Sequence, residues 1–236
     1  SFAFTGITIM QQGGSEVFRW LDFTYFGISA TLTLFSYPLI FVFEKMFGFT
    51  SDVSLLELSD TNRKLLRQLA SKAPGTFQHS LQVANLAEEA IYTIGGNSLL
   101  VRTGALYHDI GKMEMPYYFT ENQTNDINPH DDLSFEESAS IIIGHVIKGI
   151  ELAKKNKLPE QIIDFIRTHH GTTLTTYFYR SFQKQFPEQM IDEAKFHYPG
   201  PIPFSKETAV LMMADSVEAA SRSLKAHDAE TIDSLV

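Results

Sequence analysis

Cysteine is absent from this 236-residue sequence, and so is any run of lysine and arginine. Without thiols the chain forms neither disulfides nor thiolate metal sites, so a bound metal would need histidine and carboxylate ligands, which suit iron, manganese or zinc. The net charge of −9 and the missing basic stretch argue against the electrostatic grip by which proteins hold a DNA or RNA polymer. An anionic substrate would have to be met locally, by metal ions or a few placed cations.

Charged residues are also missing from residues 23–43, which read FTYFGISATLTLFSYPLIFVF. About 20 apolar residues span a bilayer core as a helix, and Thr, Ser, Gly and Pro are tolerated in membrane helices. We therefore predict a transmembrane helix over about residues 23–45. The alternatives are a buried core helix or an amphipathic helix at the membrane interface. A secretory signal is not indicated, because a basic segment and a small-residue cleavage site are missing.

The residues around this stretch predict how the chain is divided and oriented. The basic residues that follow it outnumber those close before it, with Lys45, Arg63, Lys64 and Arg67 against Arg19. By the positive-inside rule, we expect the C-terminal side to be cytoplasmic. The first residue is Ser rather than Met, which favours a fragment of a longer chain. We predict that residues 1–50 are the end of a membrane region and that residues 51–236 form a cytoplasmic domain.

From residue 52 onward, apolar residues recur at helical spacing, and capping residues, glycines and prolines divide the pattern into segments. An alternating strand pattern and a hairpin signal are not evident. The sequence therefore predicts an all-α fold, a helical bundle with short connections. The expected helices lie within residues 59–75, 76–96, 98–111, 135–155, 159–171, 172–186 and 205–224.

Local signals predict where some of these helices begin and end. Pro74 and Gly75 are expected to stop the first helix, and Gly95 the second. Asn97 is expected to cap the third helix, and Gly111 to end it in the left-handed conformation. Adjacent helical residues point about 100° apart, so two neighbouring side chains reach one site more easily where a helix ends.

Histidines and aspartates stand on or beside the apolar faces of five of these helices. They are His79, His108, Asp109, His145, His169, His170 and Asp215. A single histidine in such a place is usually a satisfied core residue, whereas an isolated buried carboxylate is costly unless it is paired or bound to metal. One shared cation site would explain all of these residues, because imidazole and carboxylate are natural ligands for iron, manganese and zinc.

A pair of divalent ions would give such a site a defined chemistry. Asp109 follows His108 directly, and an aspartate in that place can bridge two ions while the histidine binds one. Two ions about 3.5–4 Å apart activate water and stabilise the attacking and leaving oxygens of a phosphodiester. The ions would also supply the positive charge that this acidic chain otherwise lacks. The residues therefore favour metal-dependent phosphodiester hydrolysis.

The order H…HD…H…HH…D resembles the HD-domain superfamily of metal-dependent phosphohydrolases. More closely, the chain resembles the seven-transmembrane HD phosphodiesterases of bacteria, the PgpH type that cleaves cyclic di-AMP. The segments that carry this resemblance are LLELSDTN, APGTFQHSL, YHDIGKM, IIIGHVIKGIELA, THHGTT…YFY, YPGP and ADSVEAASRSL. SYPLIFVFEKMFGFTSDVSLLELSDTN resembles the last membrane helix of that family and its exit into the cytosol. The resemblance covers essentially the whole chain.

The resemblance implies an HD-domain helical bundle that hydrolyses cyclic di-AMP to pApA and so ends or tunes second-messenger signalling. The implied cofactors are two divalent ions, iron or manganese, with zinc as an option. The ligands of one ion would be His79, His108, Asp109 and Asp215, with Asp109 as the bridge. The ligands of the second would be His145, His169 and His170. The resemblance also implies the bacterial cell membrane, with the HD domain on the cytoplasmic side.

Four residues are candidates for contact with a cyclic dinucleotide. Lys112, three residues after Asp109, could meet a phosphate and share in catalysis with Asp109; its alternative role is to stabilise a helix C-terminus. Arg222, about two helical turns beyond the last aspartate, is a second phosphate candidate. Tyr177 and Tyr179 could stack on adenine, although aromatic residues at this spacing are more often core.

Other residues have simpler expected roles. His130 is expected in a solvated loop or in the outer surroundings of the site, and His197 and His227 at the surface or in structural roles. Turn geometry is the expected reason for Gly75 and for the prolines within residues 199–203. The cyclic di-GMP branch of the superfamily carries a Gly-Tyr-Pro element after the paired histidines, whereas HHGTTLTTYFY stands here, which argues against that substrate.

Two other functions compete with this interpretation. One is an HD phosphohydrolase that acts on another nucleotide, namely cyclic di-GMP, a dNTP or ppGpp. The other is a non-catalytic HD signalling module, against which the complete set of ligands argues. The expected partners are the membrane and the missing N-terminal sensor and membrane region of the parent chain. A homodimer is left open.

Overall fold

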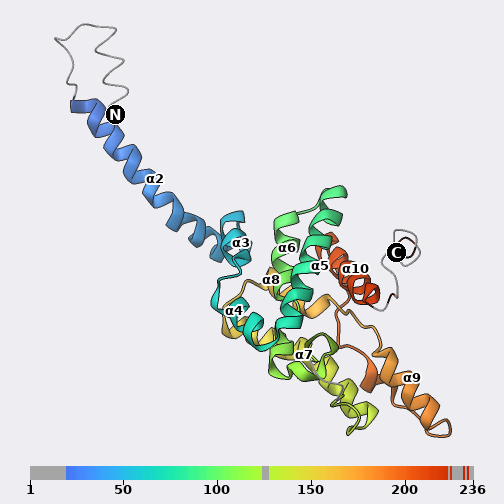
Figure 1. Cartoon of the computed structure of the whole chain (residues 1–236). Coiled ribbons are helices and arrows are strands. Elements are labelled where there is room, and N and C mark those ends of the chain that lie inside the picture. The colour runs from blue at the N-terminus through green and yellow to red at the C-terminus, as the bar shows by residue number, and fades with distance from the viewer. Residues whose placement is uncertain (1–19, 124–127, 223, 225–230, 232, 234–236) are drawn as a thin grey trace. The chain divides into compact units, whose positions relative to one another are not determined.

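A computed structural model gives the fold (Figure 1). It describes residues 20–123, 128–222, 224, 231 and 233. The expectations for residues 1–19 and for His227 lie outside the described residues. Contacts within the chain separate it into two compact units, residues 1–51 and residues 52–236.

The described part of the first unit is α2, Trp20–Phe47, a helix with no buried residue. Among the described residues it is the one helix long and apolar enough to cross a membrane, by length and composition. Thr24, Thr31 and Thr33 each donate their hydroxyl to the backbone carbonyl four residues earlier. Such bonds satisfy polar side chains where water is excluded. The exposure of α2 contradicts the alternative of a core helix within the described chain.

The second unit is built from helices, which confirms the predicted all-α bundle. No strand occurs among its described residues, and a lone antiparallel bridge joins Leu174 to His197. The α-helices are α3 (Asp52–Ser59), α4 (Lys64–Lys72), α5 (Pro74–Thr93), α6 (Ser98–Tyr107), α7 (Phe135–Lys155), α8 (Glu160–Thr168), α9 (Thr176–Gln185) and α10 (Lys206–Ser221). Short 3₁₀ helices are η1 (Ile110–Glu114), η2 (Pro116–Tyr118), η3 (Thr120–Asn122) and η4 (Glu193–Phe196).

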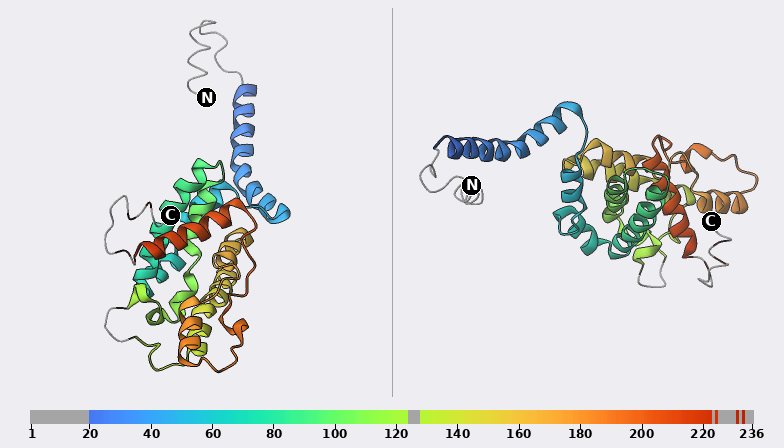
Figure 2. Two further views of the ribbon diagram at one scale, coloured as in Figure 1. Left: turned by 90° about the vertical axis from the view of Figure 1, so that its right-hand side faces the viewer. Right: turned by 90° about the horizontal axis from the view of Figure 1, so that it is seen from above.

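The main apolar core joins the helices whose ends carry the candidate site. Helix α5 packs against α4, α6 and α10, and α6 also packs against α3 and α8 (Figures 1 and 2). Leu66, Phe165 and Ile166 are among its fully buried side chains. Tyr107 donates its hydroxyl to Leu58 O at 2.8 Å, and burial raises the pKa of this phenol to about 12. A second apolar cluster holds α7, α9 and η4 together.

Some of the predicted helix ends are confirmed and others are wrong. Asn97 caps α6 by accepting a hydrogen bond from Leu100 N at 2.9 Å, and Gly95, with a left-handed φ of +71°, follows the end of α5 as the predicted stop. The first predicted helix ends before Pro74 as expected, because α4 stops at Lys72, and Pro74 is also the first residue of α5, where its fixed φ and missing N–H are tolerated. The predicted helix over residues 172–186 begins only at residue 176.

Two glycines are needed for close packing rather than for turn geometry. Gly111 lies within η1 and has no left-handed φ, so its predicted role as a left-handed stop is wrong. A Cβ at Gly111 would lie 1.8 Å from His145 O and 2.6 Å from Gly149 N of α7. A Cβ at Gly75 would lie 1.8 Å from Glu121 O. The backbone of η1 therefore rests directly on α7, which places the HD pair beside His145.

This packing predicts that Gly111→Ala destabilises the second unit by about 2 kcal/mol or more, because the methyl group has no space and η1 must move off α7. The free energy of unfolding can be compared by chemical denaturation of the full chain in detergent micelles. Gly144→Ala is the matched control on α7, where a Cβ meets nothing within 4 Å, and it should stabilise by about 0.5–1 kcal/mol. Equal stability of Gly111→Ala and the native chain would contradict the packing role.

Candidate metal centre and adjoining pocket

All seven predicted ligand residues converge on one place in the second unit. His79 comes from α5, the HD pair from the end of α6, His145 from α7, the paired histidines from the end of α8, and Asp215 from α10. Six of the seven are buried, and His170 is half-buried. Three sets offer ligand atoms within 4.8 Å of one another, namely His79–His108–Asp215, His145–His169–His170 and His108–Asp109–His169.

The two carboxylate oxygens of Asp109 face different groups of histidines. Oδ2 lies 3.3 Å from His108 Nε2 and 3.6 Å from His79 Nε2. Oδ1 lies 3.3 Å from His145 Nε2 and 3.5 Å from His169 Nε2. A carboxylate in this position can share two cations, one on each side.

Hydrogen bonds on the far side of the rings orient three of these histidines. His108, His145 and His169 each place Nδ1 against the backbone carbonyl three residues earlier, at 2.7, 2.5 and 2.8 Å respectively. A carbonyl only accepts, so Nδ1 must carry the proton and Nε2 keeps its lone pair when the ring is neutral. Each Nε2 therefore points toward Asp109 as a metal ligand would.

His79 is held by a carboxylate instead of a backbone carbonyl. Its Nδ1 donates to Glu218 Oε2 at 2.5 Å, while its Nε2 lies 2.9 Å from Asp215 Oδ1. Glu218 is 4% exposed, and its charge is matched by Arg222 Nη2 at 2.8 Å. Glu218 was missed in the sequence, although a glutamate three residues after Asp215 on an otherwise apolar helix was the available signal. Arg222 thus pairs with the carboxylate that orients His79, and its role as a phosphate contact stays a prediction.

The electrostatics of the centre call for a cation. Burial alone would raise the pKa of Asp109, but the charges of Lys112 and His108 hold it well below the usual range. Burial would lower the pKa of His108, but Asp109 and Asp215 raise it to about 10. His108 Nε2 and Asp109 Oδ1 are buried without a hydrogen-bond partner. Such orphaned atoms are rare in folded proteins, and a divalent ion between them would satisfy both.

The second group of histidines is suited to metal binding in its protonation state. Burial and the neighbouring His169 and His145 hold the pKa of His170 well below its usual value. Burial also lowers the pKa of His169. Both imidazoles are therefore neutral at pH 7, which is the form that coordinates a metal ion. The donor set of this centre fits divalent metal binding.

Lys112 lies between the centre and the adjoining pocket. Its Nζ is 2.7 Å from Asp109 Oδ2 and 2.9 Å from Glu121 Oε1, and both carboxylates raise its pKa against the effect of burial. Glu121 in turn accepts a hydrogen bond from Thr76 Oγ1 at 3.0 Å. An ammonium has three N–H donors, so one remains after these two contacts. Lys112 is thus a charged group next to the centre, and its contact with substrate stays a prediction.

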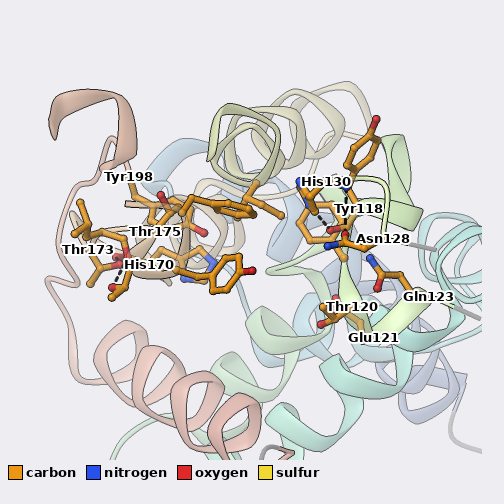
Figure 3. A pocket seen from close by; sticks show the side chains of 16 residues that line it. Tyr118, Thr120, Glu121, Gln123, Asn128, His130, His170, Thr173, Thr175 and Tyr198 are labelled. Carbon is orange, nitrogen blue, oxygen red and sulfur yellow. Dashed lines mark hydrogen bonds between the residues drawn. The ribbon is translucent and has the colours of Figure 1, made fainter. Parts of the chain in front are cut away.

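A pocket of about 660 Å³ opens beside the centre (Figure 3). His170, Thr173, Thr175 and Tyr198 lie on one side of it, and Tyr118, His130, Asn128 and Gln123 lie on the other. Its other lining residues are Phe119, Thr120, Glu121, Ile142, Leu174, Thr176, Tyr177 and Phe178. The pocket therefore meets the candidate centre at His170.

The predicted aromatic contacts divide between this pocket and the interior. Tyr177 lines the pocket and is 72% exposed, whereas Tyr179 packs on Phe196 with ring centroids 5.7 Å apart and lies outside the pocket lining. His130 is part of the pocket wall rather than of a solvated loop, with Nε2 3.0 Å from Tyr118 O. The side chain of His197 is 40% exposed, in line with the expected surface position, and its Nδ1 lies 2.9 Å from Thr172 O.

Tyr198 is a second site residue that the sequence reasoning missed. Its ring lies against that of His170, with centroids 4.2 Å apart. The segment YPGP is among those that carry the resemblance, but only turn geometry was expected for its prolines. The signal was the aromatic residue ahead of three closely spaced prolines, but its position beside His170 follows only from the tertiary fold.

Comparisons with known proteins agree with this geometry. The chain matches the HD domain family over residues 76–220. It is 47% identical over 194 residues to cyclic-di-AMP phosphodiesterase PgpH of Bacillus subtilis, a match that covers 82% of this chain and 27% of the relative. It is 50% identical over 182 residues to cyclic-di-AMP phosphodiesterase PgpH of Listeria monocytogenes, covering 77% and 25%. The chain thus spans about a quarter of the length of these two relatives.

A solved structure gives a closer comparison of the folded part. The crystal structure of the L. monocytogenes phosphodiesterase PgpH HD domain in complex with cyclic-di-AMP superposes with a TM-score of 0.71 at 48% identity. The match covers 75% of this chain and 81% of the crystallised chain. The fold of the second unit is therefore similar to that of a domain known to bind this ligand.

The centre predicts that a divalent ion stabilises the folded chain. In detergent micelles, Mn²⁺ should raise the Tm of the native chain relative to EDTA, because an ion at about 100 times its Kd adds about 2.7 kcal/mol to the free energy of unfolding. Asp109→Ala should lose most of this rise, whereas Asp132→Ala, at an exposed aspartate, should keep it. A rise as large in Asp109→Ala as in the native chain would show that Asp109 is not a shared ligand.

Proposed function

This chain belongs to the HD-domain family, alongside the PgpH HD domains, and we propose that it is a metal-dependent phosphodiesterase that hydrolyses cyclic di-AMP to pApA. The observation that carries the proposal is the position of the Asp109 carboxylate. Its two oxygens face two separate groups of histidines, at 3.3–3.6 Å. Such a centre suits phosphodiester hydrolysis, since two neighbouring metal ions can stabilise both the attacking and the leaving oxygen of that reaction. Relatives named cyclic-di-AMP phosphodiesterases support the substrate.

The proposed ligands form two sets that share one aspartate. His79, His108 and Asp215 would hold one ion, and His145, His169 and His170 would hold the other, with Asp109 facing both sets. Divalent ions bound there, iron or manganese with zinc as an option, would supply Lewis-acid polarisation of the phosphate and activation of a water. Backbone carbonyls and Glu218 would keep four of the five histidines, all but His170, in the ligating tautomer.

Lys112 is the proposed cation for the phosphate oxygens. It is held by Asp109 and Glu121, and its side chain is 12% exposed beside the pocket residue Phe119, with Nζ 5.0 Å from the ring centroid. Its remaining N–H donor can meet charge that develops on a phosphate oxygen, which a fixed cation in a dry site stabilises strongly. The pocket beside it is large enough for a nucleotide, and Tyr177 on its wall is the proposed stacking surface for adenine.

We also propose that α2 anchors the catalytic domain to the bacterial cell membrane. Residues 1–50 would be the end of a membrane region, and residues 51–236 the cytoplasmic phosphodiesterase domain. Support comes from the length and exposed apolar surface of α2 and from Lys45 in its last turn. A sensor and earlier membrane helices of a parent chain are the proposed partners.

Because the chain has no cysteine, a single introduced thiol reports on this orientation. Tyr92 is 76% exposed in the second unit, so Tyr92→Cys gives an accessible label site. In bacteria that produce this variant, a membrane-impermeant maleimide should label it only after the membrane is permeabilised. Labelling of intact cells would contradict the cytoplasmic orientation, and recovery of the protein in the soluble fraction would contradict the anchor.

The substrate proposal predicts a ranking of four nucleotides. The full chain, loaded with Mn²⁺ in detergent micelles, should hydrolyse cyclic di-AMP to pApA with a higher kcat/KM than cyclic di-GMP, dGTP or ppGpp. Chromatography of the products against standards measures both the rate and the identity of the product. If the chain binds two ions but does not hydrolyse cyclic di-AMP, the proposal is wrong. If it cleaves another nucleotide with a higher kcat/KM, that nucleotide is the preferred substrate instead.

The same assay separates the roles of individual residues. Asp109→Ala should lower kcat/KM about a thousandfold, because it removes the ligand that both proposed ions would share, and Lys112→Met about a hundredfold, because it removes a cation placed to stabilise the charge of the transition state. Lys148→Met is the matched control, since Lys148 is an exposed residue of α7 that pairs with Glu151. An unchanged rate in Lys112→Met would remove this lysine from the mechanism while leaving the metal site intact.

A further inference from the structure

His170 differs from the other four histidines of the centre in how its ring is held. The other four each have Nδ1 within hydrogen-bond distance of an acceptor, a backbone carbonyl or Glu218. Within the described chain, the ring nitrogens of His170 make no such contact, and its side chain is half-buried at the edge of the pocket. A metal ligand usually needs an outer partner that fixes its orientation. The orientation of His170 must therefore have another source.

Two aromatic rings enclose His170. The Tyr198 ring lies 4.2 Å away between centroids, at an interplanar angle of 30°, and the His169 ring lies 4.0 Å away at 43°. Tyr198 is 8% exposed, so its ring is itself confined. Close ring contact of this kind, although tilted, restricts rotation of an imidazole about its side-chain bonds, because a turned ring would collide with the phenol.

The position of Tyr198 is fixed by pairing with the segment that follows His170. Tyr198 N donates to Thr173 O at 2.9 Å, and Thr175 N donates to Phe196 O at 2.8 Å. The isolated bridge between residues 174 and 197 lies between these two bonds. The ligand and the ring that stacks on it are therefore carried by two adjacent paired segments. A shift of either segment would therefore move the other through these backbone hydrogen bonds.

We propose that Tyr198 is a positioning residue whose ring holds His170 in the orientation that completes the His145–His169–His170 metal subsite. This inference rests on the proposed two-ion centre. Its consequence is that affinity at this one subsite depends on the Tyr198 ring, whereas the subsite of His79, His108 and Asp215, which Glu218 supports, does not. The contact is made by the ring face, so the aromatic ring and not the hydroxyl is required.

Metal titration tests the proposal without reference to activity. The full chain in detergent micelles is stripped with EDTA and titrated with Mn²⁺, with free Mn²⁺ followed by electron paramagnetic resonance. The native chain should bind two ions, and His170→Ala should identify which binding event belongs to the His145–His169–His170 subsite. Tyr198→Leu should weaken that same event about tenfold or more, the size of effect that loss of an outer partner has on a metal site.

Tyr198→Phe keeps the ring and should bind both ions like the native chain. Tyr92→Leu, the same change at a residue that is 76% exposed on α5, should also leave both events unchanged. Binding of the other ion, at the subsite of His79, His108 and Asp215, serves as an internal check on folding. A misfolded Tyr198→Leu chain would lose both binding events.

Three results would overturn the inference. Native affinity of Tyr198→Leu at both subsites would show that the ring does not position His170. Tyr198→Leu could instead weaken both events equally while folding like the native chain by circular dichroism, which would make its effect general. Loss of the second ion in Tyr198→Phe would assign the role to the hydroxyl. Failure of the native chain to bind a second ion is a different outcome, because it would contradict the proposed two-ion centre itself.

Discussion

The structure depends on one buried carboxylate, that of Asp109. A buried charge is costly unless it is compensated, and Asp109 is 2% exposed among four imidazoles. Lys112 compensates one oxygen, Oδ2, at 2.7 Å, and His108, whose pKa is raised by Asp109 and Asp215, lies 3.3 Å from the same oxygen. The other oxygen, Oδ1, has no hydrogen-bond partner. This incomplete compensation is what favours divalent ions over a purely structural polar cluster.

The surrounding fold serves to bring five helices to this carboxylate. Asp109 follows the end of α6, and the next turn, η1, rests on α7 so closely that a methyl group at Gly111 would overlap His145 O. Gly104 plays a similar part where α6 meets α8, since a Cβ there would lie 2.4 Å from the Phe165 ring. Close packing is rigid because neighbouring groups leave no room to shift. The close packing of the backbone therefore fixes where the ligand side chains begin, in addition to the hydrogen bonds that orient them.

The two sides of the proposed centre are supported by different forces. His79 is fixed by the buried Glu218, which is itself held by Arg222, so charge-assisted hydrogen bonds set its position. His170 is enclosed by aromatic rings and opens onto the pocket. His79 and Glu218 are not among the residues that line the pocket, whereas His170 and Tyr198 are part of its wall. The candidate centre and the pocket therefore meet on the His170 side.

The sequence by itself determined the helical class and the apolar segment that became α2, because helical periodicity and apolar length are read from neighbouring residues. It also determined the seven residues of the candidate centre, because each is a polar group in an apolar setting, where burial is costly without a partner. The tertiary structure decided what depends on segments meeting. Glu218 reaches His79 across 139 positions, and Tyr198 reaches His170 through a backbone pairing that no periodicity announces. Gly111 looked like a helix stop because sequence shows a missing side chain, and only the packed fold shows which neighbour needs that space.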